Sequence, residues 1–500
     1  MCNMYRRYLF HLLVLLLPSL FVSCAMAESS LRLAPYFTSG MVLQRHQPIC
    51  IHGYACAGEK VRVDFLQSQQ IATCDKDGRW QVCLPEQKAG GPYILKVESE
   101  GEEVEVRDIY IGEVWLCSGQ SNMQLPVRET MGAAEDIASA SQQKRVHLYQ
   151  MRPSRIPFAE AWEKTYVDSL KRNEYYLPAQ WTKCEAKTVA DFSAIGYHFG
   201  RLLSEKLDCH VGIICNAVDG SLCESWIDSQ TLASGCLDLN KEWWTEPLIQ
   251  QWARNRAKTN LKNYPEALPY HPYAPSYLFD CGIAPLEGLA LAGVLWYQGE
   301  GNAHNATLHE QLFPLLQKSW RTHFAAPELP FYFVQLSGIS TLPTWGHFRD
   351  SQRRLGVLPH TYMTVSHDLG EAKNIHPKRK REIAERLVAA ALVHEYSQAG
   401  VPCGPVYLGA ELKSNKILLH FQYGKGMHTS DGKAPKGFEV AGKNGAFVPA
   451  KARIVGETIE VWSDAVAQPQ QVRYAWDSFP QANVVGSNGF PISTFSDHVF

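Results

Sequence analysis

Hydrophobic and polar positions divide the chain into three regions. Residues from about 30 to 108 form short alternating segments, such as 60–65 and 80–84, separated by Gly, Asp and Pro turns. This pattern indicates a small β-sandwich. Similar short segments return after residue 400. The sequence therefore predicts β-rich regions at both ends of a middle region of different character.

The middle region alternates helical and strand patterns, which is typical of a parallel sheet covered by helices on both faces. Helical spacing covers residues 192–207, 308–323 and 379–396, and buried-strand runs cover 211–214, 289–297 and 330–336. Two excursions, 127–181 and 232–276, are polar and irregular, and the second is rich in Trp and Tyr. We expect such excursions to form a binding rim.

One apolar run stands out because it ends abruptly in polar residues. Residues 109–116 read as a buried strand, and the chain continues as Cys117-Ser118-Gly119-Gln120-Ser121-Asn122. Polar turns at the carboxyl ends of buried strands are where α/β sheets place their chemistry. Ser121 is therefore a candidate nucleophile. The alternative is that Ser118 and Ser121 only cap the next helix.

Three further polar stretches follow predicted strands. Gly220, after the run 211–214, can bring a backbone amide close to a ligand. Asn302, after the run 289–297, can donate a hydrogen bond to an oxyanion. His376 precedes a helix and can act as the general base that a serine nucleophile requires. Each also has a structural interpretation as a turn, a helix cap or a helix start.

Composition narrows the function classes. The 500 residues carry 48 basic and 50 acidic side chains, so the near-zero net charge gives no reason to expect a nucleic acid partner. The 14 Cys contain no C-x-x-C pair and the 18 His are dispersed, which argues against a zinc site and predicts no metal or other cofactor. Cys74 and Cys83 flank a turn-like segment and are expected to form a disulfide across a hairpin.

The amino terminus has the pattern of an export signal. Arg6 and Arg7 precede an apolar segment, and Ala25-Met26-Ala27 offers a cleavage site. An alternative route leaves Cys24 as a lipid anchor. No later run is long enough to span a membrane. We expect an exported protein, periplasmic, secreted or surface-anchored, divided into a signal peptide (1–27), a β-sandwich-like domain (28–108), a catalytic α/β domain (109–400) and a β-rich region (401–500).

The polar stretches together resemble those of a known family. Gly119-Gln120-Ser121-Asn122-Met123, Trp296-Tyr297-Gln298-Gly299-Glu300 and Ile375-His376-Pro377 look like the blocks of the SGNH hydrolases, in their sialate O-acetylesterase branch. The segments 437–442 and 472–476 also look like that family. The resemblance implies a flavodoxin-like parallel sheet and a serine esterase without metal.

The resemblance also implies roles for individual residues. Ser121 is the expected nucleophile and His376 its base, following general triad logic. The backbone amides of Ser121 and Gly220 and the side chain of Asn302 are expected to hold the oxyanion. Substrate contacts are expected from Gln120, Gln298 and Glu300.

Two positions depart from the family pattern. Many SGNH enzymes carry an Asp three residues before the His, and Lys373 stands there in this chain. Asp368 is our candidate for orienting His376, with Glu371 or a backbone carbonyl as alternatives. The family often shows paired glycines where this chain has Asp219-Gly220.

The resulting hypothesis is an exported esterase that removes acetyl groups from carbohydrate, with the 9-O-acetyl group of sialic acid as the expected substrate. One alternative is an esterase of acetyl xylan or another polysaccharide. Another is a carbohydrate-binding protein whose α/β domain is inert. The sequence leaves open the sugar, the acetyl position and the oligomeric state.

Overall fold

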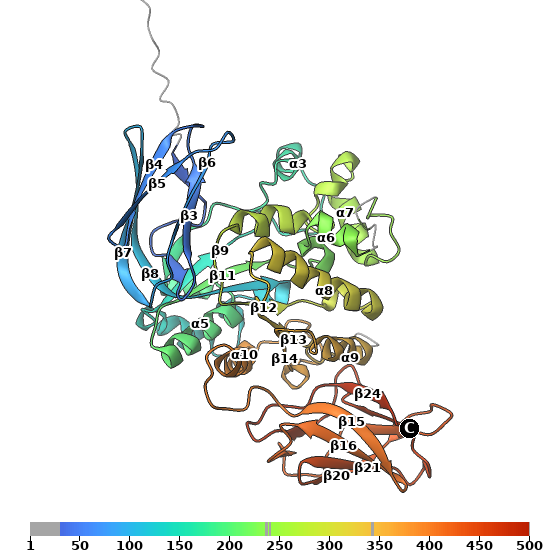
Figure 1. The fold of residues 1–500 in the computed structure, drawn as a ribbon. Coiled ribbons are helices and arrows are strands. Elements are labelled where there is room, and N and C mark those ends of the chain that lie inside the picture. The colour runs from blue at the N-terminus through green and yellow to red at the C-terminus, as the bar shows by residue number, and fades with distance from the viewer. Residues whose placement is uncertain (1–30, 236–238, 240–241, 342–344, 500) are drawn as a thin grey trace, which may run out of the picture.

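The computed structural model describes residues 31–235, 239, 242–341 and 345–499 (Figure 1). The predicted signal peptide, with Cys24, lies outside the described residues. Within the described ranges, no helix is long and apolar enough to cross a bilayer.

The centre of the molecule is a parallel sheet, as the alternating pattern predicts. Its strand order is β10-β9-β11-β8-β12-β13-β14, and all neighbours from β9 to β14 are parallel. β8 is the first of these strands in the chain and lies in the middle, so its carboxyl end is a switch point of the sheet. The strands span Glu102–Gly119 (β8), Val146–Gln150 (β9), Trp181–Lys183 (β10), Val211–Ala217 (β11), Gly293–Tyr297 (β12), Phe331–Val334 (β13) and Thr361–Thr364 (β14).

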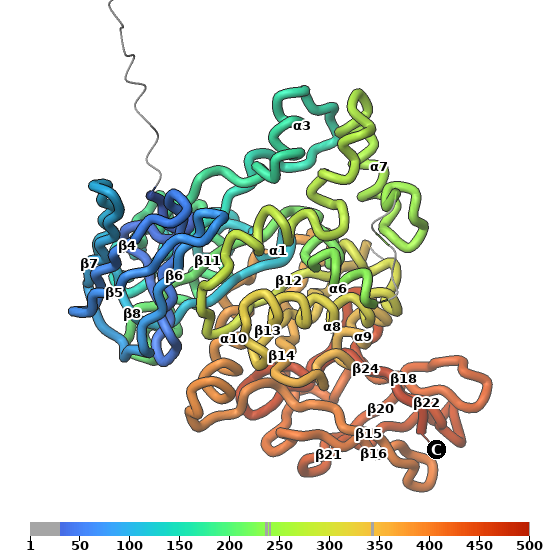
Figure 2. The backbone as a smooth tube through the Cα atoms, turned by 45° about the horizontal axis from the view of Figure 1, so that its top comes forward, coloured from blue at the N-terminus to red at the C-terminus, as the bar shows by residue number. Residues whose placement is uncertain are grey.

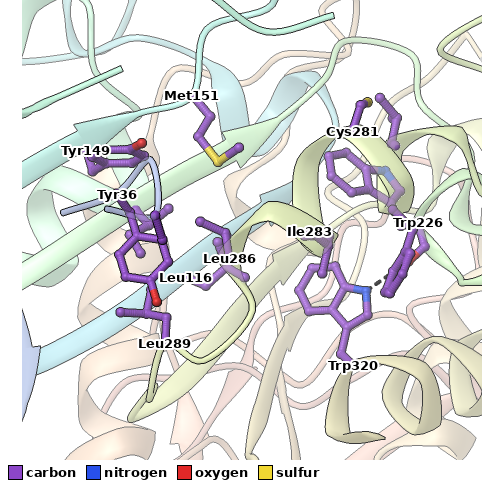
Figure 3. Close-up of a cluster of buried hydrophobic side chains, with 14 of the residues drawn as sticks. Tyr36, Leu116, Tyr149, Met151, Trp226, Cys281, Ile283, Leu286, Leu289 and Trp320 are labelled. Carbon is purple, nitrogen blue, oxygen red and sulfur yellow. Dashed lines mark hydrogen bonds between the residues drawn. The ribbon is translucent and has the colours of Figure 1, made fainter. Parts of the chain in front are cut away.

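Both faces of the sheet are buried. Successive residues of a strand point to opposite faces, and Ile213 and Ile214 of β11 accordingly join two different hydrophobic clusters. Helices α5 (Ala194–Leu207) and α10 (Lys380–His394) cover one face, and α8 (Ala306–His323) covers the other. Figure 3 shows part of the cluster on the α8 face, where the indole nitrogen of Trp320 donates to the backbone carbonyl of Trp226 at 2.8 Å. The predicted α/β architecture is confirmed.

The amino-terminal β-region is continuous with the central sheet. Strand β8 pairs with β7 (Gly90–Ser99) at its start and with β11 and β12 at its end, so it belongs to both. The predicted boundary at residue 108 therefore falls inside a strand. The remaining strands of this region are β1 (Arg32–Leu33), β2 (Val42–Gln44), β3 (Ile49–Tyr54), β4 (Lys60–Phe65), β5 (Ser68–Thr73) and β6 (Arg79–Leu84).

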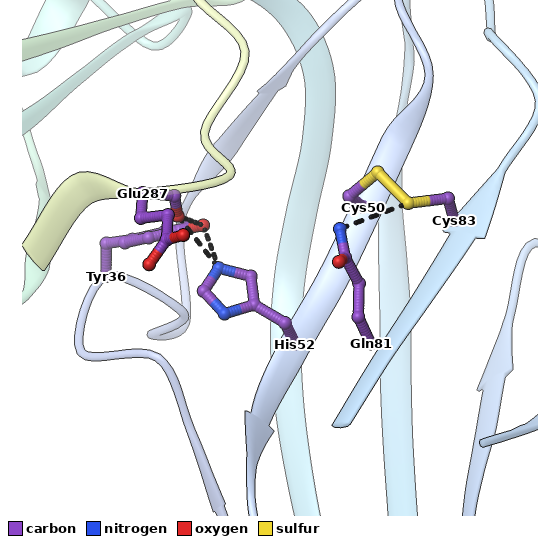
Figure 4. The surroundings of a disulfide bond; sticks show 6 residues. All are labelled: Tyr36, Cys50, His52, Gln81, Cys83 and Glu287. Carbon is purple, nitrogen blue, oxygen red and sulfur yellow. Dashed lines mark hydrogen bonds between the residues drawn. A yellow bond between two sulfur atoms is a disulfide. The ribbon is translucent and has the colours of Figure 1, made fainter. Parts of the chain in front are cut away.

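The disulfide of this region differs from the expected one. Cys50 and Cys83 are directly opposite each other on β3 and β6 and are bonded (Figure 4). Cys74 is instead a buried free thiol. The Cys74–Cys83 prediction is wrong because the turn between these residues does not bring them into register.

The excursion 127–181 is more regular than predicted. It holds β9, which joins the parallel sheet, and α3 (Lys164–Lys171). Helix α3 lies beside the second excursion, which begins within α6 (Ser229–Ser234) and carries α7 (Gln251–Asn260) (Figure 2). The two excursions are joined by side-chain bonds, because Asn260 donates to the carbonyls of Phe158 and Glu160, both at 2.6 Å. They rise together above the carboxyl end of the sheet.

The carboxyl-terminal region is all β, as predicted. Arg349 of α9 (Trp345–Leu355) is buried and links this region to the α/β domain through the carbonyls of Ala475 and Ser478 and the hydroxyl of Thr494. The strands are β15 (Val406–Lys413), β16 (Lys416–Gln422), β17 (His428–Thr429), β18 (Phe438–Ala441), β19 (Val448–Pro449), β20 (Lys451–Val455), β21 (Thr458–Trp462), β22 (Gln471–Tyr474), β23 (Val484–Val485) and β24 (Phe495–His498).

Candidate active site

Ser121 lies at the carboxyl end of the central strand. Strand β8 ends at Gly119, and the short helix α1 (Ser121–Gln124) begins two residues later. Gly119 has a φ of +130°, and a Cβ there would lie 2.2 Å from the carbonyl oxygen of Tyr297 on β12. Only glycine fits this turn. The turn directs Ser121 out of the sheet edge into a cavity.

His376 meets Ser121 from a different part of the chain. It lies in the loop before α10, and its Nε2 is 2.8 Å from the Ser121 Oγ. Burial lowers the pKa of His376 more than the nearby Asp219 carboxylate raises it. The imidazole is therefore neutral at pH 7 and can accept the serine proton. This is the geometry of a nucleophile paired with its base.

Two side chains fix the loop that carries His376. Asn374 accepts a hydrogen bond from the backbone amide of His376 at 3.0 Å and donates one to its carbonyl at 2.8 Å. Glu371 accepts from the Asn374 side chain at 3.1 Å and from the backbone amide of Lys378 at 2.7 Å. Glu371 thus supports the backbone around His376 and not its imidazole ring.

Asp368 is not positioned to orient His376. Its carboxylate forms two hydrogen bonds with Arg386 of α10, at 2.7 and 2.6 Å. Burial raises the pKa of Asp368, but the hydrogen bonds and charge of Arg386 more than offset this and lower it. The carboxylate that was predicted to orient His376 is thus paired with Arg386 instead. The arrangement at Ser121 is a Ser-His pair.

Asn302 lies in a buried hydrogen-bond network. Its Oδ1 accepts from the Cys223 amide at 2.9 Å and from Gln298 at 2.7 Å, and its Nδ2 donates to Glu224 at 2.9 Å. Burial raises the pKa of Glu224, and a buried carboxyl needs such donors. Asn302 and Gln298 are each 1% exposed and line neither cavity beside Ser121. The structure therefore gives both a supporting position, instead of the predicted oxyanion and substrate contacts.

The oxyanion role of the Gly220 amide stays a prediction, and the structure gives the position of this residue. It lines the cavity that contains Ser121 and has a φ of +69°. A Cβ at this position would lie 2.6 Å from the Tyr273 hydroxyl and 2.7 Å from the Trp252 ring. Backbone conformation and close packing both require glycine here.

A buried polar cluster joins the three sequence blocks. Asn122 donates to Glu300 and, at 2.9 Å, to the carbonyl of Ile375, which precedes His376. Its Oδ1 accepts from the fully buried Lys380 at 2.6 Å. Burial lowers the pKa of Lys380 to about 7 and raises that of Glu300. The nucleophile loop and the histidine loop are thereby held together.

Gln120 and Glu300 line a cavity, and their substrate contacts stay a prediction. The Oε1 of Gln120 accepts from the amides of Gly299 and Gly301, at 3.4 and 3.2 Å. Glu300 is engaged by Asn122 in the cluster described above. Gln120 is thus held rigidly at the cavity wall.

Two cavities meet at Ser121, Asp219 and His376. One measures about 440 Å³ and is lined by residues of the first excursion, including Arg128 and Arg152. The other measures about 530 Å³ and is lined by residues of the second excursion. The composition of the second excursion predicted such a rim, but only some of its aromatic residues belong to it: Trp252 and Tyr273 line the cavity, whereas Trp243 is buried in the core.

Sequence reasoning missed several residues of this site. Asp219 lines both cavities, and Lys380 and Arg256 lie in helices that carried no motif. The signal for Asp219 was its substitution for a family glycine. Among the described residues, no group of three or more His, Cys, Asp or Glu could hold a metal ion.

Comparison with known proteins identifies relatives along most of the chain. Residues 111–393 match the family described as carbohydrate esterase, sialic acid-specific acetylesterase. The sialate O-acetylesterase of Rattus norvegicus is 28% identical over 501 residues, which cover 90% of each chain. The sialate O-acetylesterase of Homo sapiens is 26% identical over 93% of this chain and 91% of its own. A carbohydrate acetylesterase from Xanthomonas citri has a similar crystal structure, with a TM-score of 0.80, 30% identity and coverage of 93% of this chain and 99% of its own.

Proposed function

The chain belongs to the sialic acid-specific acetylesterase family of carbohydrate esterases, and on this premise we propose that it hydrolyses 9-O-acetyl esters of sialic acid through an acyl-enzyme on Ser121. Its membership makes it an esterase of carbohydrate O-acetyl groups. The sugar, the acetyl position and the serine mechanism are the proposed part.

The observation that carries the mechanism is the 2.8 Å contact between His376 Nε2 and Ser121 Oγ, both of which line a cavity. A serine hydroxyl is a weak nucleophile until a base accepts its proton. A neutral imidazole within hydrogen-bond distance supplies that base.

In the first half-reaction, the Ser121 Oγ attacks the acetyl carbonyl carbon while His376 takes the hydroxyl proton. The carbonyl oxygen becomes an oxyanion, for which the amides of Ser121 and Gly220 are the proposed donors. Collapse of this intermediate breaks the bond to the sugar oxygen, and His376 returns the proton to that oxygen. The products are the free sugar hydroxyl and an acetyl ester on Ser121.

In the second half-reaction, His376 removes a proton from water as the water attacks the acetyl-serine. The second oxyanion collapses, His376 gives the proton to the Ser121 oxygen, and acetic acid leaves and ionises in solution to acetate and a proton. Each oxyanion donor of such a site contributes about 10²- to 10³-fold in rate.

The test is acetate release from O-acetylated sialic acid and from acetylated xylan by the wild type and by Ser121→Ala. We expect turnover of the sialic acid and its loss in the variant. Ser118→Ala is the matched control, because Ser118 is buried on β8 and its hydroxyl has no hydrogen-bond partner among the described residues. Full activity of Ser121→Ala would refute the serine mechanism, and turnover of xylan alone would replace the sialate substrate by a neutral polysaccharide.

We also propose that the protein is exported, on the basis of the pattern in residues 1–27. Mass spectrometry of the mature amino terminus tests this proposal. A terminus at Glu28 supports signal cleavage, a lipidated Cys24 supports a membrane anchor, and an intact Met1 in the cell interior would refute export.

A further inference from the structure

The larger cavity beside Ser121 is lined by an arginine, Arg256, for which the described residues provide no acidic partner. Arg256 lines this cavity and donates one hydrogen bond, to the backbone carbonyl of Pro157. Within the described part of the chain it forms no ion pair. A guanidinium beside a cavity and without a counterion is suited to bind an anionic group such as a carboxylate.

The wall around Arg256 is suited to a sugar ring. Arg256 and Trp252 are four residues apart on α7, so they share one face of the helix. Trp252 and Tyr273 both reach the surface of Gly220, next to the proposed oxyanion position. A cavity of about 530 Å³ with aromatic residues in its wall falls in the range of small-molecule sites.

The acidic and basic residues of the cavity lie in different parts of its wall. Asp219 lies beside Ser121 and His376, where both cavities meet, and it has no ion-pair partner among the described residues. Arg256 stands on α7, in the wall contributed by the second excursion. Glu300, the other acidic residue of this cavity wall, is held by Asn122. An anionic substrate group is therefore repelled near the acidic residues and attracted toward Arg256.

We propose that Arg256 binds the carboxylate of an acidic sugar and thereby places the acetyl ester of that sugar at Ser121. This inference rests on the proposed function and identifies the residue that selects acidic over neutral acetylated sugars. Arg256 acts on binding, and the chemistry at Ser121 does not require it.

The experiment compares Arg256→Met with the wild type on three substrates: O-acetylated sialic acid, its carboxyl methyl ester, and p-nitrophenyl acetate. We expect kcat/KM for the free acid to fall about 10- to 100-fold, mainly through KM, as for loss of one charge-assisted hydrogen bond. The methyl ester and p-nitrophenyl acetate lack the charge, so their kcat/KM should change less than about threefold. Arg256→Lys should restore part of the preference for the free acid.

Arg254→Met is the matched control. Arg254 lies on the same helix and donates to the carbonyls of Ile249 and Thr245, away from the cavity. Arg254→Met should leave kcat/KM unchanged for all three substrates. The inference would be overturned if Arg256→Met lowered kcat/KM equally for the free acid and the methyl ester, or for neither. Turnover of p-nitrophenyl acetate would in that case still support the esterase assignment. No turnover of any substrate by the wild type would instead refute the proposed function.

Discussion

Replacement of Asp368 by Asn separates a structural role from a catalytic one. The structure pairs the Asp368 carboxylate with Arg386, whose side chain is 9% exposed and also donates to the carbonyl of Val365 at 2.6 Å. Asp368→Asn removes the negative charge with little change in size. The Arg386 guanidinium then stays nearly buried without a counterion.

The magnitude follows from the burial of the two partners. Removing one partner of a fully buried pair costs about 3–5 kcal/mol, and an exposed pair contributes at most about 1 kcal/mol. The Asp368 side chain is 29% exposed, between these cases. We therefore expect Asp368→Asn to lower the free energy of unfolding by about 1–3 kcal/mol. Loss of a triad acid would instead lower kcat by about 10⁴-fold.

The assay measures urea unfolding and kcat of Asp368→Asn on the same preparation. We expect the lower unfolding midpoint with kcat within about tenfold of the wild type. Arg386→Gln, which breaks the same pair from the other side, should give a similar result. A kcat reduced more than about 10³-fold with an unchanged unfolding midpoint would refute this reasoning and restore Asp368 as the acid of a triad.

The remaining predictions concern the histidine, its loop and the disulfide. Because burial lowers the pKa of His376, kcat/KM should fall only when the pH drops below an apparent pKa that is itself under 6.5. Asp219→Asn should lower this apparent pKa further, because it removes a negative charge that raises it. An unchanged pH profile of Asp219→Asn would contradict the effect assigned to Asp219. Asn374→Ala frees the His376 backbone and should lower kcat about 10- to 100-fold with little change in thermal midpoint. Cys50→Ser opens a disulfide between residues 33 apart and should cost about 4 kcal/mol in chemical unfolding, whereas Cys74→Ser should cost much less.

The fold was predictable where local pattern and burial agree. The helices over 194–207 and 306–323 and the strands at 211–217 and 293–297 follow directly from apolar spacing. Strand β9 was missed because Val-His-Leu-Tyr-Gln alternates weakly, although the sheet buries even its His147. Tertiary packing, absent from the sequence pattern, decides such cases.

The site was predictable in its residue types but less so in its contacts. Ser121 and His376 come together as proposed, since parallel strands end at one edge of a sheet. Asp368 was chosen because it is close to His376 along the chain, but α10 places Arg386 within hydrogen-bond distance of its carboxylate. The prediction for Asn302 has the same limit. The sequence shows that an amide is present, but only the structure shows that this amide donates to Glu224.

Strand β8 constrains how this gene can change. Its 18 residues begin in the amino-terminal β-region and end one residue before Gln120, with Ser121 next. Side chains alternate along a strand, so one inserted or deleted residue would turn every side chain beyond it to the wrong face. Insertions can accumulate in the excursions that form the rim, but not in this strand. Substrate preference can therefore diversify among descendants of this chain, whereas its amino-terminal region cannot be exchanged or removed at residue 108 without displacing the nucleophile.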